Sequence, residues 1–286
     1  MSEDYNNSGG QGKAKSEHKT HVVCVHGSCH GGWCFESQFR PAFEKQGFGF
    51  HAPDLPGHGK DRRGLLPSAS AFQCLGVGAY GRALRREVEK LSLERPEENL
   101  VLLAHSMGGH VVSEYLRSNR AAAVVFLAPV PPAGTWASIR RAYANPVTRP
   151  WLVEAFVTGN FYALVGTPER AHALFWNHLS QAEGRTYHPL LGRESLASFL
   201  QGWFLRRPNP ALWQQGGGPA RRLVVGGDKD AIFEWQEMAA MADRISADRR
   251  LFADMGHDLM LGAGGGEVAQ YIVQWLQGEV ESSQDK

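Results

Sequence analysis

The sequence predicts an α/β fold built on a mainly parallel sheet of about six strands. Short, largely apolar runs alternate along the chain with longer segments of helical periodicity, which is the pattern of βαβ units in a doubly wound sheet. Nearly continuous apolar runs are typical of strands that are buried on both faces. One connection is much longer than the others, and its length indicates an inserted set of helices rather than a loop.

Six segments have strand character, namely His21–Val25, Phe48–Ala52, Asn99–Ala104, Ala122–Ala128, Arg222–Gly226 and Arg249–Ala253. The spacing of apolar residues predicts five helices, namely Glu36–Lys45, Ala79–Leu91, Met107–Arg117, Phe233–Asp243 and Glu267–Gln277. Each expected helix follows an expected strand, so the chain can return to the same edge of the sheet and add strands in parallel.

The long connection follows the fourth expected strand. It opens with the proline-rich PVPPAG, closes with the glycine-rich QQGGGP, and holds 13 of the 29 aromatic residues of the chain. We therefore expect one domain, with residues 20–130 and 214–286 as the core and residues 131–213 as a helical cap. Some of these aromatic side chains should line a pocket at the carboxyl edge of the sheet, with Trp176 and Trp203 as candidates. In the alternative interpretation, they form the core of the cap itself.

Composition and charge exclude several classes of protein. The chain has 30 basic and 29 acidic residues, so no strong field would attract nucleic acid or an anionic membrane. Residues 1–19 are polar and are expected to form a disordered tail rather than a signal peptide. No apolar run reaches the length of a membrane span, so no stable membrane insertion is expected. The four cysteines lack zinc-site spacing, which predicts reduced thiols and an intracellular, cytoplasmic location. No metal or cofactor is expected.

One serine lies where a strand meets a helix. The stretch LAHSMGGH places Ser106 directly after the expected strand Asn99–Ala104 and directly before the expected helix Met107–Arg117. A serine in this context becomes an exposed nucleophile when the residues two before and two after it are small, as Ala104 and Gly108 are. The alternative is that the Ser106 hydroxyl caps the helix.

The first expected strand leads into a glycine-rich loop with the sequence HGSCHGGW, His26 to Trp33. Backbone N–H groups of such a loop can stabilise an oxyanion together with the N–H of the residue after the nucleophile. We therefore predict an oxyanion hole formed by the N–H groups of Ser28 and Met107. His26 and His30 are expected to orient the loop, and an ordinary tight turn is the alternative interpretation of the glycines.

A serine nucleophile requires a base, and the base requires an orienting acid. The stretch VVGGDKDAIF places Asp228 and Asp230 after one late strand, and FADMGHDLML places His257 after the last strand. His257 is the candidate base and either aspartate is a candidate acid. Alternatively, His257 is an ordinary histidine of a surface loop and Asp230 caps the following helix.

These motifs resemble the α/β-hydrolase superfamily from residue 20 to residue 277. They follow the order of that family and comprise HG at 26–27, PDLPGHG at 53–59, AHSMGG at 104–109, a GxxDxI-like stretch at 227–232 and GHDLML at 256–261. In that pattern the aspartate followed by x-Ile is the acid, which selects Asp230 over Asp228 and leaves Asp228 to fix the turn. The resulting chain order of Ser106, Asp230 and His257 is that of the family. HGSCHGGW and AHSMGG look most like small plant-type methyl esterases, hydroxynitrile lyases and their bacterial esterase relatives.

The resemblance implies a serine hydrolase that cleaves a carboxylic ester with an apolar acyl or alcohol group of moderate size through an acyl-enzyme. Similar dehalogenases and epoxide hydrolases carry aspartate in place of Ser106. Hydroxynitrile lyases carry threonine in place of Gly27 and lysine in place of Asp258, which argues against a lyase. Lipase, lysophospholipase, thioesterase or lactonase activity, a cofactor-free oxygenase, and a small-molecule receptor that keeps the triad are the alternatives.

Overall fold

A computed structural model describes residues 20–60, 72–96, 99–131, 134–202 and 221–280 of the chain. Its centre is a six-stranded sheet in the order β2-β1-β3-β4-β5-β6, and every neighbouring pair is parallel. The strands are β1 Thr20–Val25, β2 Gly49–His51, β3 Asn99–His105, β4 Ala123–Leu127, β5 Arg221–Gly227 and β6 Asp248–Phe252. The predicted fold class is confirmed, and the strand limits differ from the predicted ones by a few residues at most.

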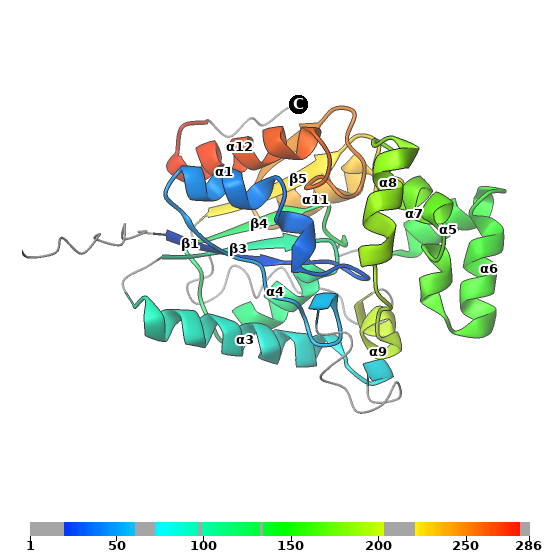
Figure 1. The fold of residues 1–286 in the computed structure, drawn as a ribbon, viewed down its shortest axis with the longest axis horizontal. Helices are drawn as coiled ribbons and strands as arrows, with labels where there is room; N and C mark the ends of the chain where they lie inside the picture. The colour runs from blue at the N-terminus through cyan, green and yellow to red at the C-terminus, as the bar shows by residue number, and fades with distance from the viewer. Residues whose placement is uncertain (1–19, 61–71, 97–98, 132–133, 203–220, 281–286) are drawn as a thin grey trace, which may run out of the picture.

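Helices cover both faces of the sheet (Figure 1). They are α1 Phe39–Lys45, α3 Val77–Glu94, α4 Gly108–Leu116, α11 Trp235–Arg244 and α12 Gly264–Gln277, and a short 3-10 turn, η1 Gly32–Phe35, precedes α1. Helices α1 and α12 pack together on one face, α3 and α4 pack together on the other, and α11 contacts β5 and β6. Both faces are covered because the chain moves from β1 to β2 in one direction across the sheet and from β2 onward in the opposite direction. Right-handed crossovers that run in opposite directions place their helices on opposite faces.

The spacing of apolar residues explains how the helices pack. In α3, the buried side chains of Val77, Tyr80, Leu84 and Val88 recur every three to four residues and form one stripe. The opposite side of this helix is polar, so it packs on the sheet with one face and meets solvent with the other. Throughout the described ranges, no helix has the length and apolar character that crossing a membrane requires.

The chain between β4 and β5 is helical over residues 134–202, a stretch that we call the helical insertion. It contains α5 Trp136–Ala144, α6 Arg149–Thr158, η3 Phe161–Leu164, α7 Pro168–Leu174, α8 Gln181–Tyr187, η4 His188–Leu190 and α9 Leu196–Leu200. These helices lie beyond the carboxyl ends of the strands (Figure 1). The expected tail at 1–19 and residues 203–213 of the expected cap, Trp203 among them, lie outside the described residues.

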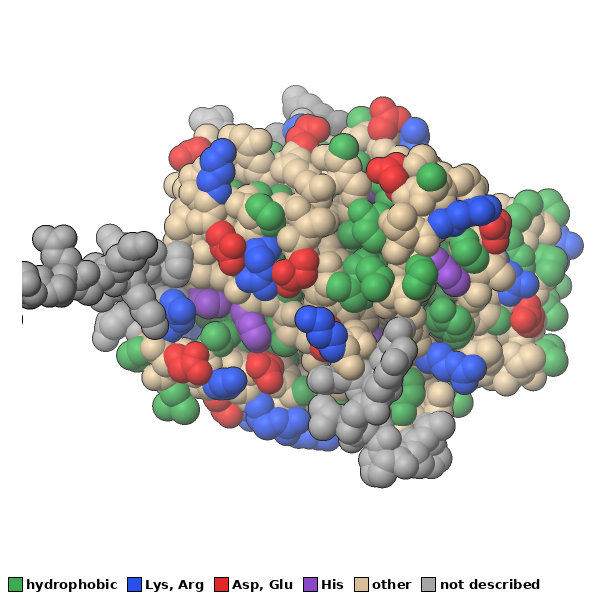
Figure 2. Space-filling model, in the orientation of Figure 1, with side chains coloured by type: hydrophobic (Ala, Val, Ile, Leu, Met, Phe, Trp, Pro, Cys, Tyr) green, Lys and Arg blue, Asp and Glu red, His purple; other side chains and the backbone are tan. Residues whose placement is uncertain are grey.

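The molecular surface has charges of both signs. On the face drawn in Figure 2, basic and acidic side chains are interspersed, and hydrophobic side chains gather over the helical insertion. Exposed apolar side chains of α5 and α6 include Tyr143, Val153 and Val157. The mixed charges agree with the formal net charge of +1.

A buried carboxylate ties the helical insertion to the core. Glu194, between η4 and α9, accepts hydrogen bonds from the Tyr80 hydroxyl of α3 at 2.9 Å and from the Ser198 hydroxyl at 2.5 Å. Its other oxygen lies 3.2 Å from His58 Nε2, and His58 Nδ1 lies 3.3 Å from the Pro56 carbonyl oxygen. Since acceptors face both ring nitrogens, His58 carries both protons and forms an ion pair with Glu194.

The His58–Glu194 pair is inaccessible to water, with side chains 0% and 1% exposed. Burial lowers the pKa of His58, but the Glu194 charge and hydrogen bond outweigh burial, and the net pKa lies above the ordinary value. Burial raises the pKa of Glu194, but the His58 charge and the hydrogen bonds to the carboxylate leave the net pKa below the ordinary value. Both groups are therefore held in their charged forms.

Glu194→Gln should destabilise the protein by about 3 kcal/mol or more, because it leaves the charge of His58 buried without a partner. The matched control is Glu87→Gln, which breaks a more exposed pair with His51 whose atoms are 3.4 Å apart. This control should change the free energy of unfolding by less than about 1 kcal/mol. Urea unfolding of both variants measures the difference, and equal losses would contradict a buried ion pair.

Candidate active site

Ser106 occupies a strained turn between β3 and α4. Its φ angle of 51° lies in the left-handed region, which residues with a side chain rarely adopt. The Ser106 N–H donates to the Leu127 carbonyl at 2.9 Å, and the Ser106 carbonyl accepts from the Gly109 N–H at 3.1 Å. Met107 is the N-cap residue of α4 and no side chain caps this helix, so the Ser106 hydroxyl is free of that role.

Close packing around this turn requires glycine at two positions. A Cβ added at Gly108 would lie 2.4 Å from the carbonyl oxygen of Val25, at the end of β1. A Cβ added at Gly27 would lie 2.9 Å from Ser106 Cβ. This crowding also leaves no room for the threonine that hydroxynitrile lyases carry in place of Gly27.

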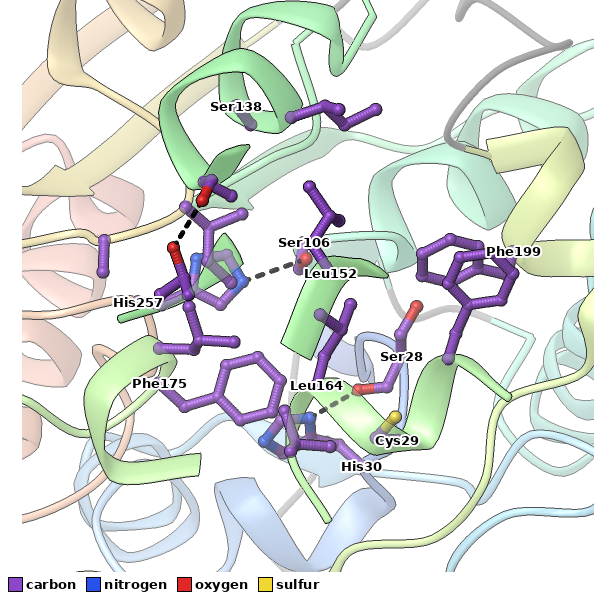
Figure 3. Close-up of a pocket in the computed structure, with 18 of the residues that line it drawn as sticks. Ser28, Cys29, His30, Ser106, Ser138, Leu152, Leu164, Phe175, Phe199 and His257 are labelled. Atoms are coloured by element: carbon purple, nitrogen blue, oxygen red, sulfur yellow. Dashed lines mark hydrogen bonds between the residues drawn. The ribbon is translucent and has the colours of Figure 1, made fainter. Parts of the chain in front are cut away.

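The structure brings Ser106, His257 and Asp230 together in one chain of hydrogen bonds. His257 Nε2 lies 3.1 Å from Ser106 Oγ (Figure 3), and His257 Nδ1 lies 2.8 Å from Asp230 Oδ2. His257 is 1% exposed, and the Asp230 side chain is fully buried. Asp230 Oδ1 accepts from the backbone N–H groups of Ile232 at 2.8 Å and Phe233 at 3.0 Å, which fix the carboxylate in place.

The expectation that the Asp228 side chain fixes the turn is wrong. Its side chain is exposed, and no hydrogen bond to its carboxylate occurs among the residues that the structure describes. The Asp228 N–H bonds to the Phe252 carbonyl at 3.1 Å, which extends the pairing of β5 with β6 and leaves the side chain facing solvent. Asp230 does both tasks, since it binds two N–H groups of the turn and also faces His257.

Opposing effects act on the pKa of His257. Burial disfavours the imidazolium and lowers the pKa, whereas the charge and hydrogen bond of Asp230, with a smaller contribution from Asp258, raise it. The net pKa lies above the ordinary histidine value. His257 can therefore act as a base, because the buried Asp230 carboxylate stabilises its protonated form.

The predicted oxyanion donors belong to Ser28, in the loop after β1, and to Met107, the residue after Ser106. Ser28 lines the same pocket as Ser106, and its hydroxyl lies 3.3 Å from Sδ of Met107, the residue after Ser106. Within the described parts of the chain, neither the Ser28 N–H nor the Met107 N–H has a hydrogen-bond acceptor. Both N–H groups are therefore available to a ligand, which few backbone N–H groups in a folded protein are.

The pocket beside Ser106 is mostly apolar and lies between the core and the helical insertion (Figure 3). The insertion contributes mainly apolar side chains, among them Ile139, Leu152, Phe161, Leu164, Leu174, Phe175 and Phe199. The rings of Phe161 and Phe199 stack at 3.9 Å and form one wall. Over the described ranges, no Asp, Glu, Lys or Arg lines the pocket, so the walls suit neutral, apolar groups.

Trp176 does not line this pocket, contrary to expectation. Its side chain is 0% exposed, and its indole N–H donates to the carboxylate of Asp258 behind the pocket wall. The adjacent Phe175 faces the pocket instead and stacks on His257 with 5.8 Å between ring centroids. The buried carboxylate of Asp258 therefore determines which of the two neighbouring aromatic residues lines the pocket.

His105 and Asp258 were not assigned from the sequence, yet with His30 they form a buried group with the composition of a metal site. One ligand atom from each lies within 4.8 Å of the others. Two ligands of a tetrahedral zinc ion are roughly 3.3 Å apart, whereas His30 Nε2 and Asp258 Oδ2 are 2.8 Å apart and share a hydrogen. The geometry fits a hydrogen-bonded pair better than a metal site. The sequence signal that could have identified Asp258 is its position directly after His257 in GHDLML.

Comparison with known proteins agrees with the fold. The model of the alpha/beta hydrolase family matches residues 22–271. Methylesterase 3 from Arabidopsis thaliana is 33% identical over 96 residues, which cover 34% of this chain and 33% of that protein. Salicylic acid-binding protein 2 from Nicotiana tabacum is 34% identical over 89 residues, which cover 31% and 30%. The chain thus spans about a third of the length of these curated relatives.

Among solved structures, polyneuridine aldehyde esterase superposes with a TM-score of 0.63 and 17% sequence identity. The superposition covers 91% of this chain and 99% of that chain. At this identity the likeness concerns the fold alone.

The packing of α4 on β1 can be tested with two neighbouring glycines. Gly108→Ala should destabilise the protein by about 1–3 kcal/mol, because the new Cβ meets a backbone carbonyl that has no room to move. In Gly109→Ala the new Cβ would meet Phe126 at 3.5 Å, an ordinary contact. This control should be neutral or stabilising by up to about 1 kcal/mol, since alanine favours the helix. Equal unfolding midpoints of the two variants in urea would show that α4 does not approach β1 so closely.

Proposed function

This chain belongs to the alpha/beta hydrolase family, and from that premise we propose that it is a serine hydrolase of carboxylic esters. The observation that carries the proposal is the hydrogen-bond chain from Ser106 through His257 to Asp230 beside an apolar pocket. The partial similarity to plant methylesterases supports the same class of substrate. The substrate is a small ester with an apolar acyl or alcohol group of moderate size.

In the proposed mechanism, Ser106 Oγ attacks the carbonyl carbon of the ester while His257 Nε2 takes the hydroxyl proton. Asp230 stabilises the imidazolium that forms. The N–H groups of Ser28 and Met107 donate to the oxyanion of the tetrahedral intermediate. His257 then gives its proton to the departing alcohol oxygen, and the acyl-enzyme on Ser106 is hydrolysed by a water molecule that His257 activates.

The helical insertion is proposed to act as a cap that selects the substrate. Its aliphatic and aromatic side chains form most of the wall opposite Ser106. An apolar acyl or alkyl group that entered this pocket would bury its surface against these side chains. These walls favour an ester with an apolar acyl or alcohol group of moderate size.

Ser106→Ala should lower kcat by a factor on the order of 10⁶ and abolish labelling by a fluorophosphonate probe. The control is Ser28→Ala, which removes a hydroxyl in the same pocket but keeps the proposed N–H donor, and it should retain most activity. Both are measured on a panel of neutral esters of increasing acyl size. Full labelling of Ser106→Ala would remove Ser106 from the mechanism. Ligand binding without turnover by the unmodified chain would favour a receptor.

Asp230→Asn should lower kcat by about 10⁴-fold, because asparagine favours the wrong imidazole tautomer, as in the serine-protease example. Asp228→Asn is the matched control two residues away on the same loop. Its exposed carboxylate makes no hydrogen bond within the described residues, so kcat should be retained and stability should change by less than about 0.5 kcal/mol. Steady-state kinetics of the folded variants decide between the two residues, and an inactive Asp228→Asn would overturn the assignment of the acid.

The pH dependence of kcat/KM should show one essential base. Only neutral His257 accepts the serine proton, so activity is present above the pKa of His257 and is lost as the pH falls through it. Because Asp230 raises this pKa, the midpoint should lie above the ordinary value of about 6.5. The residual activity of Asp230→Asn should have a lower midpoint, since the raising charge is gone. The measurement uses a neutral ester between about pH 5 and 9, and a flat profile would exclude a histidine base.

A further inference from the structure

A buried cluster joins three of the four loops that carry the proposed catalytic groups. Asp258 directly follows the proposed base, His105 directly precedes the proposed nucleophile, and His30 lies two residues after Ser28. The three side chains are between 0% and 1% exposed. None of them takes part in the mechanism proposed above, so their convergence requires another explanation.

The carboxylate of Asp258 is the centre of this cluster. Its Oδ2 accepts hydrogen bonds from His30 Nε2 at 2.8 Å and from the Trp176 indole N–H at 2.5 Å. An indole N–H can only donate, so this oxygen must be an acceptor. Burial raises the pKa of Asp258, but the charge and hydrogen bond of His30, together with neighbouring histidines, outweigh burial and leave the net pKa well below the ordinary value. Asp258 is therefore ionised.

His30 faces an acceptor on each ring nitrogen. Its Nδ1 lies 2.8 Å from the carbonyl oxygen of Ser28 (Figure 3), and its Nε2 lies 2.8 Å from Asp258 Oδ2. A carbonyl oxygen and an ionised carboxylate both accept and never donate, so each ring nitrogen must carry a proton. His30 is thus an imidazolium that forms a buried ion pair with Asp258 and donates its second proton to the Ser28 peptide.

We propose that Asp258 is a positioning residue, which acts through His30 to hold Ser28 so that its N–H faces the oxyanion. The inference rests on the proposed function, in which this N–H is an oxyanion donor. The carbonyl and N–H groups of Ser28 belong to one residue, so the bond that fixes the carbonyl also restricts the direction of the N–H.

Backbone strain shows why the loop needs such support. Cys29, between Ser28 and His30, has a φ angle of 68°, a conformation that costs a non-glycine residue roughly 1 kcal/mol or more. The strained residue is held from the far side by the Gly192 N–H of the helical insertion, which donates to the Cys29 carbonyl at 2.8 Å. Without the His30 bond on the near side, the loop can relax and the Ser28 N–H can turn away.

His105 lies between the same carboxylate and the backbone of the base. Its Nε2 lies 3.2 Å from the His257 carbonyl oxygen and 3.5 Å from Asp258 Oδ1, so this nitrogen carries the proton. Burial holds the pKa of His105 well below its ordinary value, so this ring is neutral. Asp258 therefore supports the oxyanion loop through His30, and its other oxygen lies beside His105, which binds the backbone of the base.

The kinetic test compares Asp258→Asn with Trp176→Phe. Both variants disturb the hydrogen bonds of the same oxygen. Asp258→Asn keeps the size of the side chain and removes the charge that holds His30, whereas Trp176→Phe makes a buried side chain smaller and keeps that charge. Asp258→Asn should lower kcat by about 10²-fold with little change in KM, the effect of a misplaced oxyanion donor. Trp176→Phe should keep most of its kcat. Unchanged kcat in folded Asp258→Asn would overturn the inference.

A double variant shows whether Asp258 acts through His30. Asp258→Asn combined with His30→Gln should lose no more kcat than the more damaging single change, whereas multiplied losses would contradict one shared path. Ester hydrolysis by the unmodified chain and its fluorophosphonate labelling at Ser106 test the proposed function separately. If these fail, the proposed function falls. If they succeed and Asp258→Asn is fully active, only the positioning role falls.

The protonation of His30 can be measured without any substitution in the molecule under test. In the unmodified chain labelled with ¹⁵N-histidine, both ring nitrogens of His30 should carry a proton, because each faces a hydrogen-bond acceptor. The His30→Gln variant assigns the signal. A His30 ring with one bare nitrogen would overturn the ion pair, and so would a stoichiometric metal ion in the purified protein.

Discussion

The left-handed backbone of Ser106 is the constraint on which the site depends. A φ angle of 51° costs a serine roughly 1–3 kcal/mol, and it persists because the surrounding strands hold it. The N–H of Ser106 is bound to β4, and β1 approaches so closely that Gly27 and Gly108 have no space for a side chain. Since parallel strands end at the same edge of the sheet, the loops after β1, β5 and β6 meet at this turn.

Two buried histidine–carboxylate pairs lie where the helical insertion meets the core. Glu194 of the insertion pairs with His58 of the core, and Asp258 of the core pairs with His30 and also binds the indole N–H of Trp176 in the insertion. Burying charges costs desolvation free energy, so such pairs contribute little net stability. They do require a well-defined geometry of the two groups. The helical insertion, which supplies one side of the apolar pocket, is therefore held to the core by polar, directional hydrogen bonds.

The fold and the residues of the candidate site were predictable because each had a local signal. Strands buried on both faces are continuous apolar runs, and the loops that follow them carry Ser106, Asp230 and His257 in recognisable contexts. The pairing of His30 with Asp258 had no such signal, because it joins positions 228 residues apart and depends on which loops meet at the sheet edge.

Neighbouring residues of similar chemistry were the second source of error. Phe175 and Trp176 are both aromatic, and only the position of the buried Asp258 carboxylate determines that the indole turns inward and the phenyl ring lines the pocket. Asp228 and Asp230 are both acidic, and the pairing of β5 with β6 determines which carboxylate turns toward His257. In each case the deciding contact comes from a distant segment of the chain.

The central claim is that Ser106 carries the acyl group during turnover, and rapid-quench mass spectrometry tests it most directly. The enzyme is mixed with a neutral ester, quenched in acid before the first turnover is complete, and digested. The account predicts that the mass of the acyl group appears on the peptide that contains Ser106, and that this adduct decays as the free acid is released. An acyl group on another residue, or hydrolysis with no adduct at any time although deacylation limits the rate, would contradict it.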